Sequence, residues 1–307
     1  MEGKVIKSTG SWYSVEGEDG KTYECRLRGK LKLEGIKTTN PIAVGDFVYF
    51  NLEEKGDQSA VISSIKPREN YIIRKSTHNP RYGHIIAANV DQVILIVTLA
   101  YPVTSLGFID RMLVTAESFR LPVIIVFNKK DLMDEEMLNK YEKLSVMYEH
   151  IRYKCMLISA LEEQSYDNFY RILLGKTSLL SGHSGVGKST LLNRIDPSIS
   201  QKTSEVSSFS QKGVHSTTFA EMFKIAENSY IIDTPGIKEL GLLDIEPEEL
   251  FHFFPELREL MGKCKFYNCT HTHEPGCAIE AAFSEGKISE SRYRSYLSML
   301  ENDDNRR

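Results

Sequence analysis

Residues 182–189 read GHSGVGKS and fit the pattern G-x-x-x-x-G-K-[ST]. An apolar run, residues 178–181, precedes them, and residues 189–195 have the pattern of a helix. A strand, a loop and a helix in this order are the context in which the pattern forms a P-loop, whose backbone N–H groups surround phosphate oxygens at a helix N-terminus. We expect Lys188 to reach the β- and γ-phosphates and the Ser189 hydroxyl to coordinate Mg²⁺.

Residues 233–236 read DTPG and follow a second apolar run, residues 230–232. An aspartate at the end of a strand can hold Mg²⁺ through water, and the N–H of Gly236 can meet the γ-phosphate. Alone, this motif is as typical of a β-turn. Beside a P-loop it predicts the second half of a phosphate site.

Residues 128–131 read NKKD and follow a buried-strand pattern, residues 122–127. The Asp131 carboxylate can accept hydrogen bonds from the ring N–H and the exocyclic amine of guanine, whereas adenine offers an acceptor and no amine there. The pair Ser159-Ala160, also at a strand end, would direct a backbone N–H at the guanine carbonyl oxygen. A solvated charged turn is the alternative interpretation of residues 128–131. The predicted GTP-binding residues are Asn128, Lys129, Lys130, Asp131, Ser159, Ala160, Gly182, His183, Ser184, Gly185, Val186, Gly187, Lys188, Ser189, Thr190, Asp233 and Gly236.

The pattern of apolar, glycine and charged residues divides the 307 residues into three regions. Residues 1–67 have short strands separated by glycines, which predicts a small all-β barrel. Strands and helices alternate from about residue 90, which predicts a parallel sheet covered on both faces. After Gly241 the chain turns acidic and helical, as a third, small domain. Neither a secretory signal nor a membrane span is recognisable, so we expect a cytoplasmic protein.

Three of the five cysteines lie close together in the pattern Cys264-x₄-Cys269-x-His271-x₅-Cys277. Three thiolates and one imidazole complete a tetrahedral Zn²⁺ site with no open position, which predicts one structural zinc ion per chain. His273 is a rival for His271 as the fourth ligand. The alternative interpretation is three cysteines packed as small hydrophobic residues.

The order of the nucleotide motifs is unusual. In Ras-like GTPases the P-loop comes first and N-K-x-D and S-A come last, whereas here both of the latter precede the P-loop. With this circular permutation, the chain resembles the ribosome small-subunit-dependent GTPase A family of circularly permuted ribosome biogenesis GTPases over nearly its whole length. The resemblance implies an N-terminal OB-fold β-barrel that binds RNA at residues 1–67, a central circularly permuted P-loop α/β GTPase domain at 68–240, and a mostly helical zinc-binding domain at 241–307.

The resemblance also implies an activity and partners. The chain would hydrolyse GTP to GDP and phosphate with Mg²⁺, bind the small ribosomal subunit and its rRNA, and act in late small-subunit maturation. With a net charge of −4, contact with RNA requires a local basic patch. Such a patch is offered by Lys21, Arg26, Arg28, Lys30, Lys32 and Lys37, near Trp12, Tyr13 and Tyr23. We expect no membrane partner and a monomeric free chain.

Two other functions fit some of the motifs. One is a translation- or tRNA-associated regulatory GTPase with the same permuted parts. The other is a metabolic P-loop kinase, against which the N-K-K-D motif argues.

Residues 213–218 read GVHSTT and are similar to the G-R-H-T-T-T of the family. A threonine here would close on Mg²⁺ and the γ-phosphate, and we prefer Thr217, with Thr218 as the alternative. Ile237 stands where Ras-like enzymes place the glutamine that orients the attacking water, so intrinsic turnover should be slow, on the order of 10⁻⁴ to 10⁻² s⁻¹. His215 could orient the water instead, or it is a surface histidine; the sequence favours neither.

Overall fold

The computed structural model describes residues 1–27, 38, 40–53, 59–75, 83–197, 220–233 and 245–301. The chain forms two compact units. The first consists of Met1–Val93, Asp167–Ser181 and Lys188–Glu239, and the second of Ile94–Tyr166, Gly182–Gly187 and Leu240–Arg307. Both units combine segments far apart in the sequence, and the division at residues 67/68 and 240/241 stays a prediction. Among the described residues no helix is long and apolar enough to cross a membrane.

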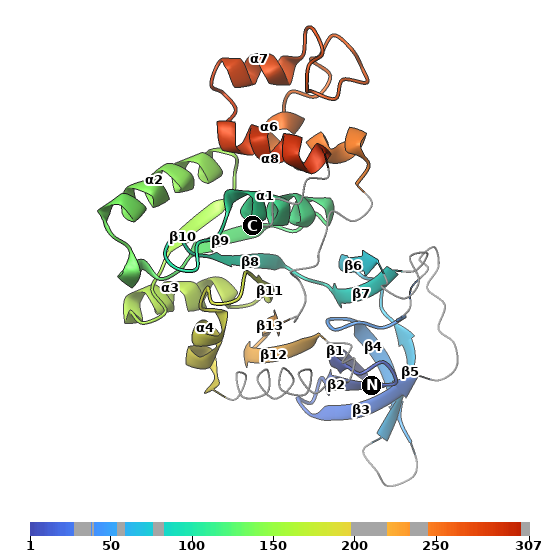
Figure 1. The fold of residues 1–307 in the computed structure, drawn as a ribbon. Coiled ribbons are helices and arrows are strands. Elements are labelled where there is room, and N and C mark those ends of the chain that lie inside the picture. The colour runs from blue at the N-terminus through green and yellow to red at the C-terminus, as the bar shows by residue number, and fades with distance from the viewer. Residues whose placement is uncertain are drawn as a thin grey trace, which may run out of the picture. The chain divides into compact units, whose positions relative to one another are not determined.

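The first unit begins with a closed five-stranded barrel (Figure 1). Each strand pairs with the next in the order β1-β2-β3-β5-β4, and β4 pairs back to β1, which confirms the barrel expected from the sequence. All neighbours are antiparallel except β3 and β5. The strands are β1 (Glu2–Ser8), β2 (Trp12–Gly17), β3 (Thr22–Leu27), β4 (Phe47–Leu52) and β5 (Ser59–Ile65).

Buried and exposed side chains alternate along these strands, and the buried ones fill the barrel. Tyr13 and Val15 of β2 point inward together with Val48 and Phe50 of β4, and all four side chains are buried. At Gly3 an added Cβ would lie 2.6 Å from the carbonyl oxygen of Glu16, so the close approach of β1 to β2 requires glycine there. The barrel thus has its own apolar core.

The first unit also contains strands of the GTPase region. Strand β11 (Thr177–Ser181) runs parallel to β13 (Ser229–Asp233), as expected, but β12 (Glu221–Ala226) runs antiparallel to β13. The sheet is therefore not wholly parallel as predicted. The reason is a tight turn, because Glu227 and Asn228 join β12 to β13 and Asn228 adopts a left-handed conformation with φ 51°.

The other elements of this unit flank those strands. The hairpin of β6 (Tyr71–Lys75) and β7 (Gly83–Ala88) was not expected from the sequence. Helix α4 (Lys188–Ile195) follows the P-loop as predicted. Helix α3 (Glu163–Leu173) begins in the second unit and ends in the first.

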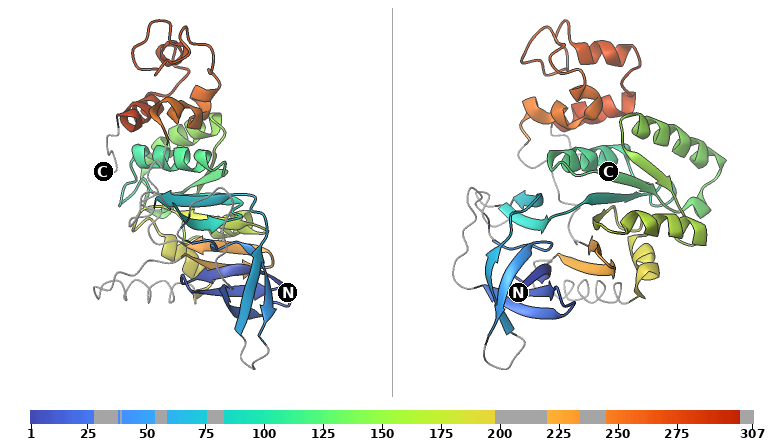
Figure 2. Two further views of the ribbon diagram at one scale, coloured as in Figure 1. Left: turned by 90° about the vertical axis from the view of Figure 1, so that its right-hand side faces the viewer. Right: turned by 180° about the vertical axis from the view of Figure 1, so that it is seen from behind.

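The second unit contains three strands in the order β10-β9-β8, and β10 runs parallel to β9. Strands β8 (Gln92–Val97) and β9 (Val123–Phe127) are buried at every position, whereas β10 (Lys154–Leu157) is only partly covered. Helix α1 (Leu106–Ser118) lies between these strands and the C-terminal helices (Figures 1 and 2). The outer helix α2 (Glu135–His150) begins at Asp134, whose carboxylate accepts from the N–H of Met137.

The C-terminal helices share a core with α1. They are η3 (Pro247–Phe253), α6 (Pro255–Arg258), α7 (Ala278–Ser284) and α8 (Glu290–Leu300). Val114 of α1 belongs to their apolar cluster, together with Phe254, Leu257 and Tyr296. The predicted third, helical region is thus packed on a helix of the GTPase region.

A buried charge network reinforces this packing. Arg292 of α8, with its side chain 1% exposed, lies 2.7 Å from Asp110 of α1 and 2.7 Å from Glu256 of α6. Its guanidinium also lies 4.5 Å from the ring centroid of Phe254, and Tyr148 of α2 donates to Asp110. Removing one charged member of such a buried network leaves an uncompensated charge, so the network holds α1, α2, α6 and α8 in one arrangement.

Candidate functional site

Asn128 joins the two loops predicted to bind the nucleotide. It follows β9, is 1% exposed, and donates from Nδ2 to the carbonyl oxygen of Val186 in the P-loop at 2.8 Å. Its Oδ1 accepts from the N–H of Ala160 at 3.2 Å. One amide side chain therefore sets the base loop, the Ser-Ala loop and the P-loop relative to one another.

The glycines of the P-loop are required by this close packing. An added Cβ on Gly187 would lie 2.3 Å from Nδ2 of Asn128, and one on Gly182 would lie 2.2 Å from the carbonyl oxygen of Ile96. Both glycines have positive φ, 98° and 144°. Any other residue at either position would displace the loop from its neighbours.

The predicted base-reading carboxylate is held from one side. Ser159, which is buried, donates from Oγ to Asp131 at 2.5 Å, and the N–H of Leu161 donates to the same Oγ. Asp131 lies in the short helix η1 (Lys130–Leu132) and is exposed. A positioned and accessible carboxylate is what recognition of the guanine donors requires.

Two lysines complete the base loop. Lys129 adopts a left-handed conformation with φ 65°, and its Nζ donates to the carbonyl oxygen of Tyr101 at 2.9 Å. Lys130 lies 3.9 Å from Glu162 in an exposed ion pair. The side chain of Lys129 thus spans from the base loop to the segment after β8, which the sequence did not indicate.

The P-loop itself has two buried residues, Gly182 and Val186, and several accessible ones. Val186 is buried, and the ring of His183 lies 3.7 Å from that of Phe108 in α1. Ser184 and Gly185 are exposed, as are Ser189 and Thr190 in the first turn of α4, which Lys188 begins. The arrangement leaves backbone N–H groups and hydroxyls where a helix N-terminus favours an anion.

Asp233 is the last residue of β13 and pairs in register with Leu180 of β11, directly before the P-loop. Other predicted residues lie outside the described residues. These are Gly236 and Ile237, the switch residues His215, Thr217 and Thr218, and four members of the basic patch, Arg28, Lys30, Lys32 and Lys37.

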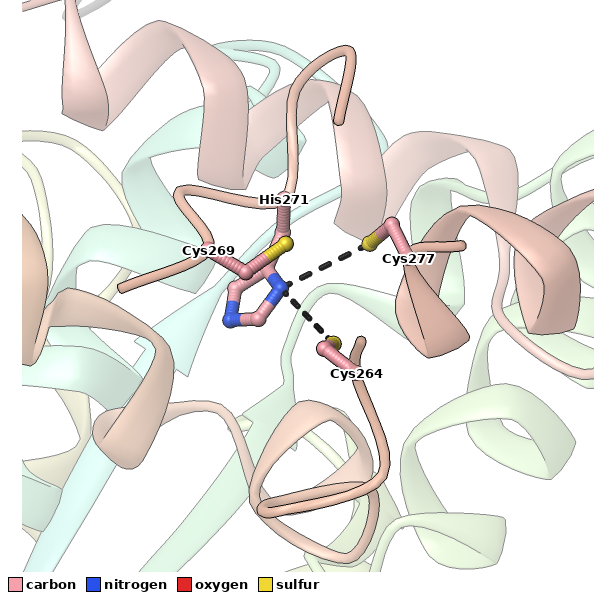
Figure 3. A group of neighbouring side chains, drawn as sticks. All are labelled: Cys264, Cys269, His271 and Cys277. Atoms are coloured by element: carbon pink, nitrogen blue, oxygen red, sulfur yellow. Dashed lines mark hydrogen bonds between the residues drawn. The ribbon is translucent and has the colours of Figure 1, made fainter. Parts of the chain in front are cut away.

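The predicted metal ligands come together in one cluster (Figure 3). The ligand atoms of Cys264, Cys269, His271 and Cys277 all lie within 4.8 Å of one another. Nδ1 of His271 is 3.5 Å from Sγ of Cys264 and 3.6 Å from Sγ of Cys277. A tetrahedral zinc ion with Zn–S of about 2.3 Å and Zn–N of about 2.1 Å separates S from N by about 3.6 Å, so the donor set fits a metal of that size.

The hydrogen bonds around His271 indicate the same use. Burial lowers its pKa, which favours the neutral imidazole that binds metals. Among the described residues, buried Nε2 has no hydrogen-bond partner, and Nδ1 is the nitrogen directed at the sulfurs. His273 is exposed, and its Nδ1 lies 2.7 Å from the hydroxyl of Thr272, outside the cluster.

The cluster loop is held by residues that sequence reasoning missed. The Glu274 carboxylate accepts from the N–H groups of Thr270, Thr272 and His273, and although burial opposes ionisation, these bonds lower its pKa well below the usual range. Two tyrosines of α8 donate to loop carbonyls, Tyr293 to His271 and Tyr296 to Thr270. Only the E-P-G-C stretch pointed toward Glu274, and nothing in the sequence pointed to the tyrosines.

The cluster sulfurs also accept backbone hydrogen bonds. The N–H of Ala278 lies 3.3 Å from Sγ of Cys264, and that of Glu280 lies 3.4 Å from Sγ of Cys277, which caps α7. Such N–H donors stabilise the thiolate form that a metal requires. The cluster therefore has the features of a closed structural metal site.

Two family models together match most of the chain. The model described as RsgA N-terminal domain matches residues 2–62, and that described as RsgA GTPase matches residues 65–243. A protein of Bacteroides fragilis named small ribosomal subunit biogenesis GTPase RsgA is 52% identical over 301 residues, which are 98% of this chain and 96% of that protein. A protein of Cytophaga hutchinsonii with the same name is 52% identical over 307 residues, all of both chains.

Two crystal structures are similar over the full chain. YjeQ from Thermotoga maritima has a TM-score of 0.79 and 37% identity, covering 100% of this chain and 99% of its own. YloQ, described as a circularly permuted GTPase, has a TM-score of 0.75 and 30% identity, covering 100% and 96%. With these matches, the motif order and the barrel, the chain belongs to the RsgA GTPase family of GTP-hydrolysing enzymes.

Proposed function

We propose that the chain acts in maturation of the small ribosomal subunit, as a GTPase that binds the subunit and its rRNA and is activated by it. Asn128 is the observation that supports the nucleotide part, because its two hydrogen bonds join the loops for base and phosphate. The names of the relatives support the small ribosomal subunit as the partner. A translation- or tRNA-associated function is not favoured by those names.

Each predicted residue then has a task at the nucleotide. Asp131, held by Ser159, would accept from the two donors of guanine. The N–H of Ala160, which donates to Asn128 in this structure, would turn to the guanine carbonyl oxygen when the nucleotide is bound. Lys188 neutralises the β- and γ-phosphate oxygens, and the P-loop N–H groups bind the remaining ones. Ser189 and Thr217, with Thr218 as the alternative, would hold Mg²⁺, which when bound neutralises charge on the transferred phosphate.

The step that this site performs poorly alone is orientation of the attacking water. Ile237 offers no hydrogen-bonding group where a glutamine would act, and His215 is the candidate substitute in this chain. Without an oriented water, hydrolysis falls to about the unassisted rate of small GTPases. A bound subunit that helps to orient the attacking water would raise that rate.

The metal cluster would hold one structural Zn²⁺, because four ligands leave no open position for a substrate. Lys21 and Arg26 of the barrel, with the exposed ring of Trp12, would contribute to rRNA binding. We further propose a monomeric chain in the cytoplasm, divided at residues 67/68 and 240/241.

GTP hydrolysis measured with and without isolated small subunits tests this function. We expect a slow rate alone and a clear increase with small subunits, with ATP hydrolysed at a negligible rate in both. Asp131→Asn should weaken GTP binding by roughly 100-fold or more and favour xanthosine triphosphate, whose carbonyl suits an amide.

Asp134→Asn is the matched control, because the same substitution three residues later changes only the cap of α2, where asparagine caps as well. Equal affinity of the unsubstituted protein for ATP and GTP would refute the base assignment. A hydrolysis rate unaffected by small subunits would refute the partner.

A further inference from the structure

Strand β1 of the barrel pairs with β12, and β12 pairs with β13, the strand that ends in Asp233 of the D-T-P-G motif. Lys7 of β1 pairs in register with Glu221 of β12, and Glu221 pairs with Asp233 of β13. The Nζ of Lys7 also lies 3.4 Å from the Glu221 carboxylate. Two strand spacings therefore separate the barrel from Asp233, the aspartate predicted to hold Mg²⁺ through water.

A second connection lies at the other end of β13. The hydroxyl of Tyr230 donates to the Glu16 carboxylate of barrel strand β2 at 2.7 Å, and Lys224 of β12 pairs with the same carboxylate at 2.6 Å. Tyr230 and Asp233 lie on one five-residue strand. Because Tyr230 is bonded to Glu16, a movement of Glu16 with β2 also moves the strand that ends in Asp233.

Lys4 of β1 is the third connection. Its Nζ lies 4.1 Å from the ring centroid of Tyr230 and 5.3 Å from that of Phe47, and it donates to Oγ1 of Thr177 in β11 at 2.9 Å. One barrel side chain thereby contacts both β13 and β11, the strand that leads into the P-loop.

Polar and aromatic side chains make these contacts between the barrel and the neighbouring strands. An open cleft of about 500 Å³ lies beside them and is lined by Lys4, Glu16, Tyr230, Lys224 and Asp91 among others. Near this cleft the barrel is joined to β12 and β13 by the pairing of β1 with β12 and by polar and cation–π contacts. Such a junction can change its arrangement at low cost when one side binds a ligand.

We propose that Tyr230, Glu16 and Lys4 are positioning residues that couple the barrel to strand β13, so that rRNA bound to the barrel changes the position of Asp233 and with it the rate of GTP hydrolysis. This inference rests on the proposed function. By reciprocity of binding free energies, a GTP analogue bound at the phosphate site then also changes the affinity of the barrel for rRNA.

The first experiment needs no ribosomal subunit. Amide hydrogen exchange of residues 2–17 is compared with GDP and with a non-hydrolysable GTP analogue bound to the full chain. In the unsubstituted protein we expect exchange of these amides to differ between the two nucleotides. Tyr230→Phe, which removes the hydroxyl bonded to Glu16 and keeps the ring under Lys4, should reduce the difference to less than half.

Tyr170→Phe is the matched control. Its hydroxyl donates to the carbonyl oxygen of Ile225 in β12, so the substitution removes a tyrosine hydroxyl bond within the same unit and leaves the Tyr230–Glu16 bond in place. This variant should retain the full nucleotide dependence. Equal nucleotide responses in Tyr230→Phe and Tyr170→Phe, or no response of residues 2–17 in the unsubstituted protein, would overturn the coupling.

The second experiment measures GTP hydrolysis with small subunits. Tyr230→Phe should lower the stimulation about threefold to tenfold, with the rate in the absence of subunits within about twofold. Glu16→Ala should behave in the same way, whereas Glu16→Gln, which still accepts from Tyr230, should recover most of the stimulation. A parallel loss of stimulated and unstimulated rates in all variants would show a purely structural role.

The two experiments separate this inference from the function on which it rests. If the unsubstituted protein is not stimulated by subunits but residues 2–17 still respond to the nucleotide, the proposed partner is wrong and the coupling stands. If subunits stimulate hydrolysis and Tyr230→Phe is stimulated as strongly as Tyr170→Phe, the partner stands and the coupling is wrong.

Discussion

The two units of the molecule each use a cation to join elements far apart in the sequence, and the two cations differ in kind. In the second unit Arg292 of α8 contacts Asp110 and Glu256. In the first unit Lys4 of β1 contacts Tyr230 and Thr177. Arginine keeps its charge at every pH a folded protein tolerates, whereas a lysine can lose its proton when it is buried.

Their surroundings act in opposite directions on the charge. Burial opposes the charge of Arg292, but Asp110 and Glu256 outweigh it and raise the pKa of the guanidinium above its usual value. Burial also opposes the charge of Lys4 and outweighs Asp91 and Glu16, so that the pKa of the ammonium falls to about 8. The C-terminal helices are therefore joined to α1 by a permanent charge, and the barrel to β13 by one that solution pH can remove.

The largest effect should come from the metal cluster, which tests whether Arg292 can hold the C-terminal helices without it. Protein purified without added metal should contain about one zinc ion per chain. Structural zinc contributes on the order of 10 kcal/mol in small domains, so removal by a chelator, or Cys269→Ser, should unfold the segment around α7 and α8 and leave the barrel intact.

Amide exchange by region measures this difference, and metal analysis measures the zinc content. Cys155→Ser, a cysteine of β10 outside the cluster, should keep the zinc. If a chelator leaves amide exchange unchanged in every region, a metal does not stabilise the C-terminal helices.

The next effect is the loss of a permanent buried charge. Arg292→Met should lower the free energy of unfolding by about 3–5 kcal/mol, because it leaves Asp110 and Glu256 buried without a cation. Arg294→Met on the same helix removes an exposed pair with Glu290 and should cost less than about 0.5 kcal/mol. Urea unfolding of both variants measures these losses in the free energy of unfolding. Similar losses for the two variants would show that burial does not distinguish the two arginines.

A smaller effect should follow from pH at Lys4. The unfolded lysine keeps its proton up to a pH near 10.5, and the folded one releases it near 8, so between these values the unfolded state binds more protons and stability rises with pH. Compared with Lys4→Met, the unsubstituted protein should gain about 2 kcal/mol between pH 7.5 and 10. The other charged groups facing Lys4, namely Asp91, Glu16 and Lys224, are the same in both proteins.

Denaturant unfolding at several pH values measures that difference. The pKa of Tyr230 is raised by burial and by its bond to Glu16, so the tyrosine stays neutral in this range. Parallel pH profiles of the two proteins would show that Lys4 remains charged and that the contrast with Arg292 is false.

The smallest effect should be at the surface of the second unit. Arg152 lies 2.9 Å from Glu259, but the two side chains are 83% and 64% exposed. Solvent screens such a pair, so Arg152→Ala should change the free energy of unfolding by less than about 0.5 kcal/mol. A cost of several kcal/mol would mean that exposed pairs also fix the C-terminal helices.

The sequence predicted best what depends on short motifs and local period. The apolar runs before the N-K-K-D motif and the P-loop became β9 and β11, and the four metal ligands lie together. These features depend on neighbours within a few residues, which a single sequence displays. Strand β10 ends at Leu157, before the pair Ser159-Ala160 that was expected at its end, because strand ends have the weakest local signal.

Long-range polar partners could not be predicted in this way. Arg292 in a polar helix looks like a surface residue, and its partner Asp110 lies 182 residues away. Lys4 and Thr177 are likewise 173 residues apart. The antiparallel strand β12 was missed because its burial is irregular and nothing in residues 221–226 records that the barrel supplies its second neighbour.

The pairing of β1 with β12 has a consequence for synthesis of the chain. Lys7 leaves the ribosome 214 residues before Glu221, which at roughly 5–20 residues per second is on the order of ten to forty seconds. During that time the edge of β1 at Lys7, beyond the residues that pair with β4, lacks the neighbour it has in the finished protein, and an open strand edge invites pairing with other chains. The shift in register between Val5 and Lys7, and the charge of Lys7 itself, are the kinds of feature that discourage such pairing while translation continues.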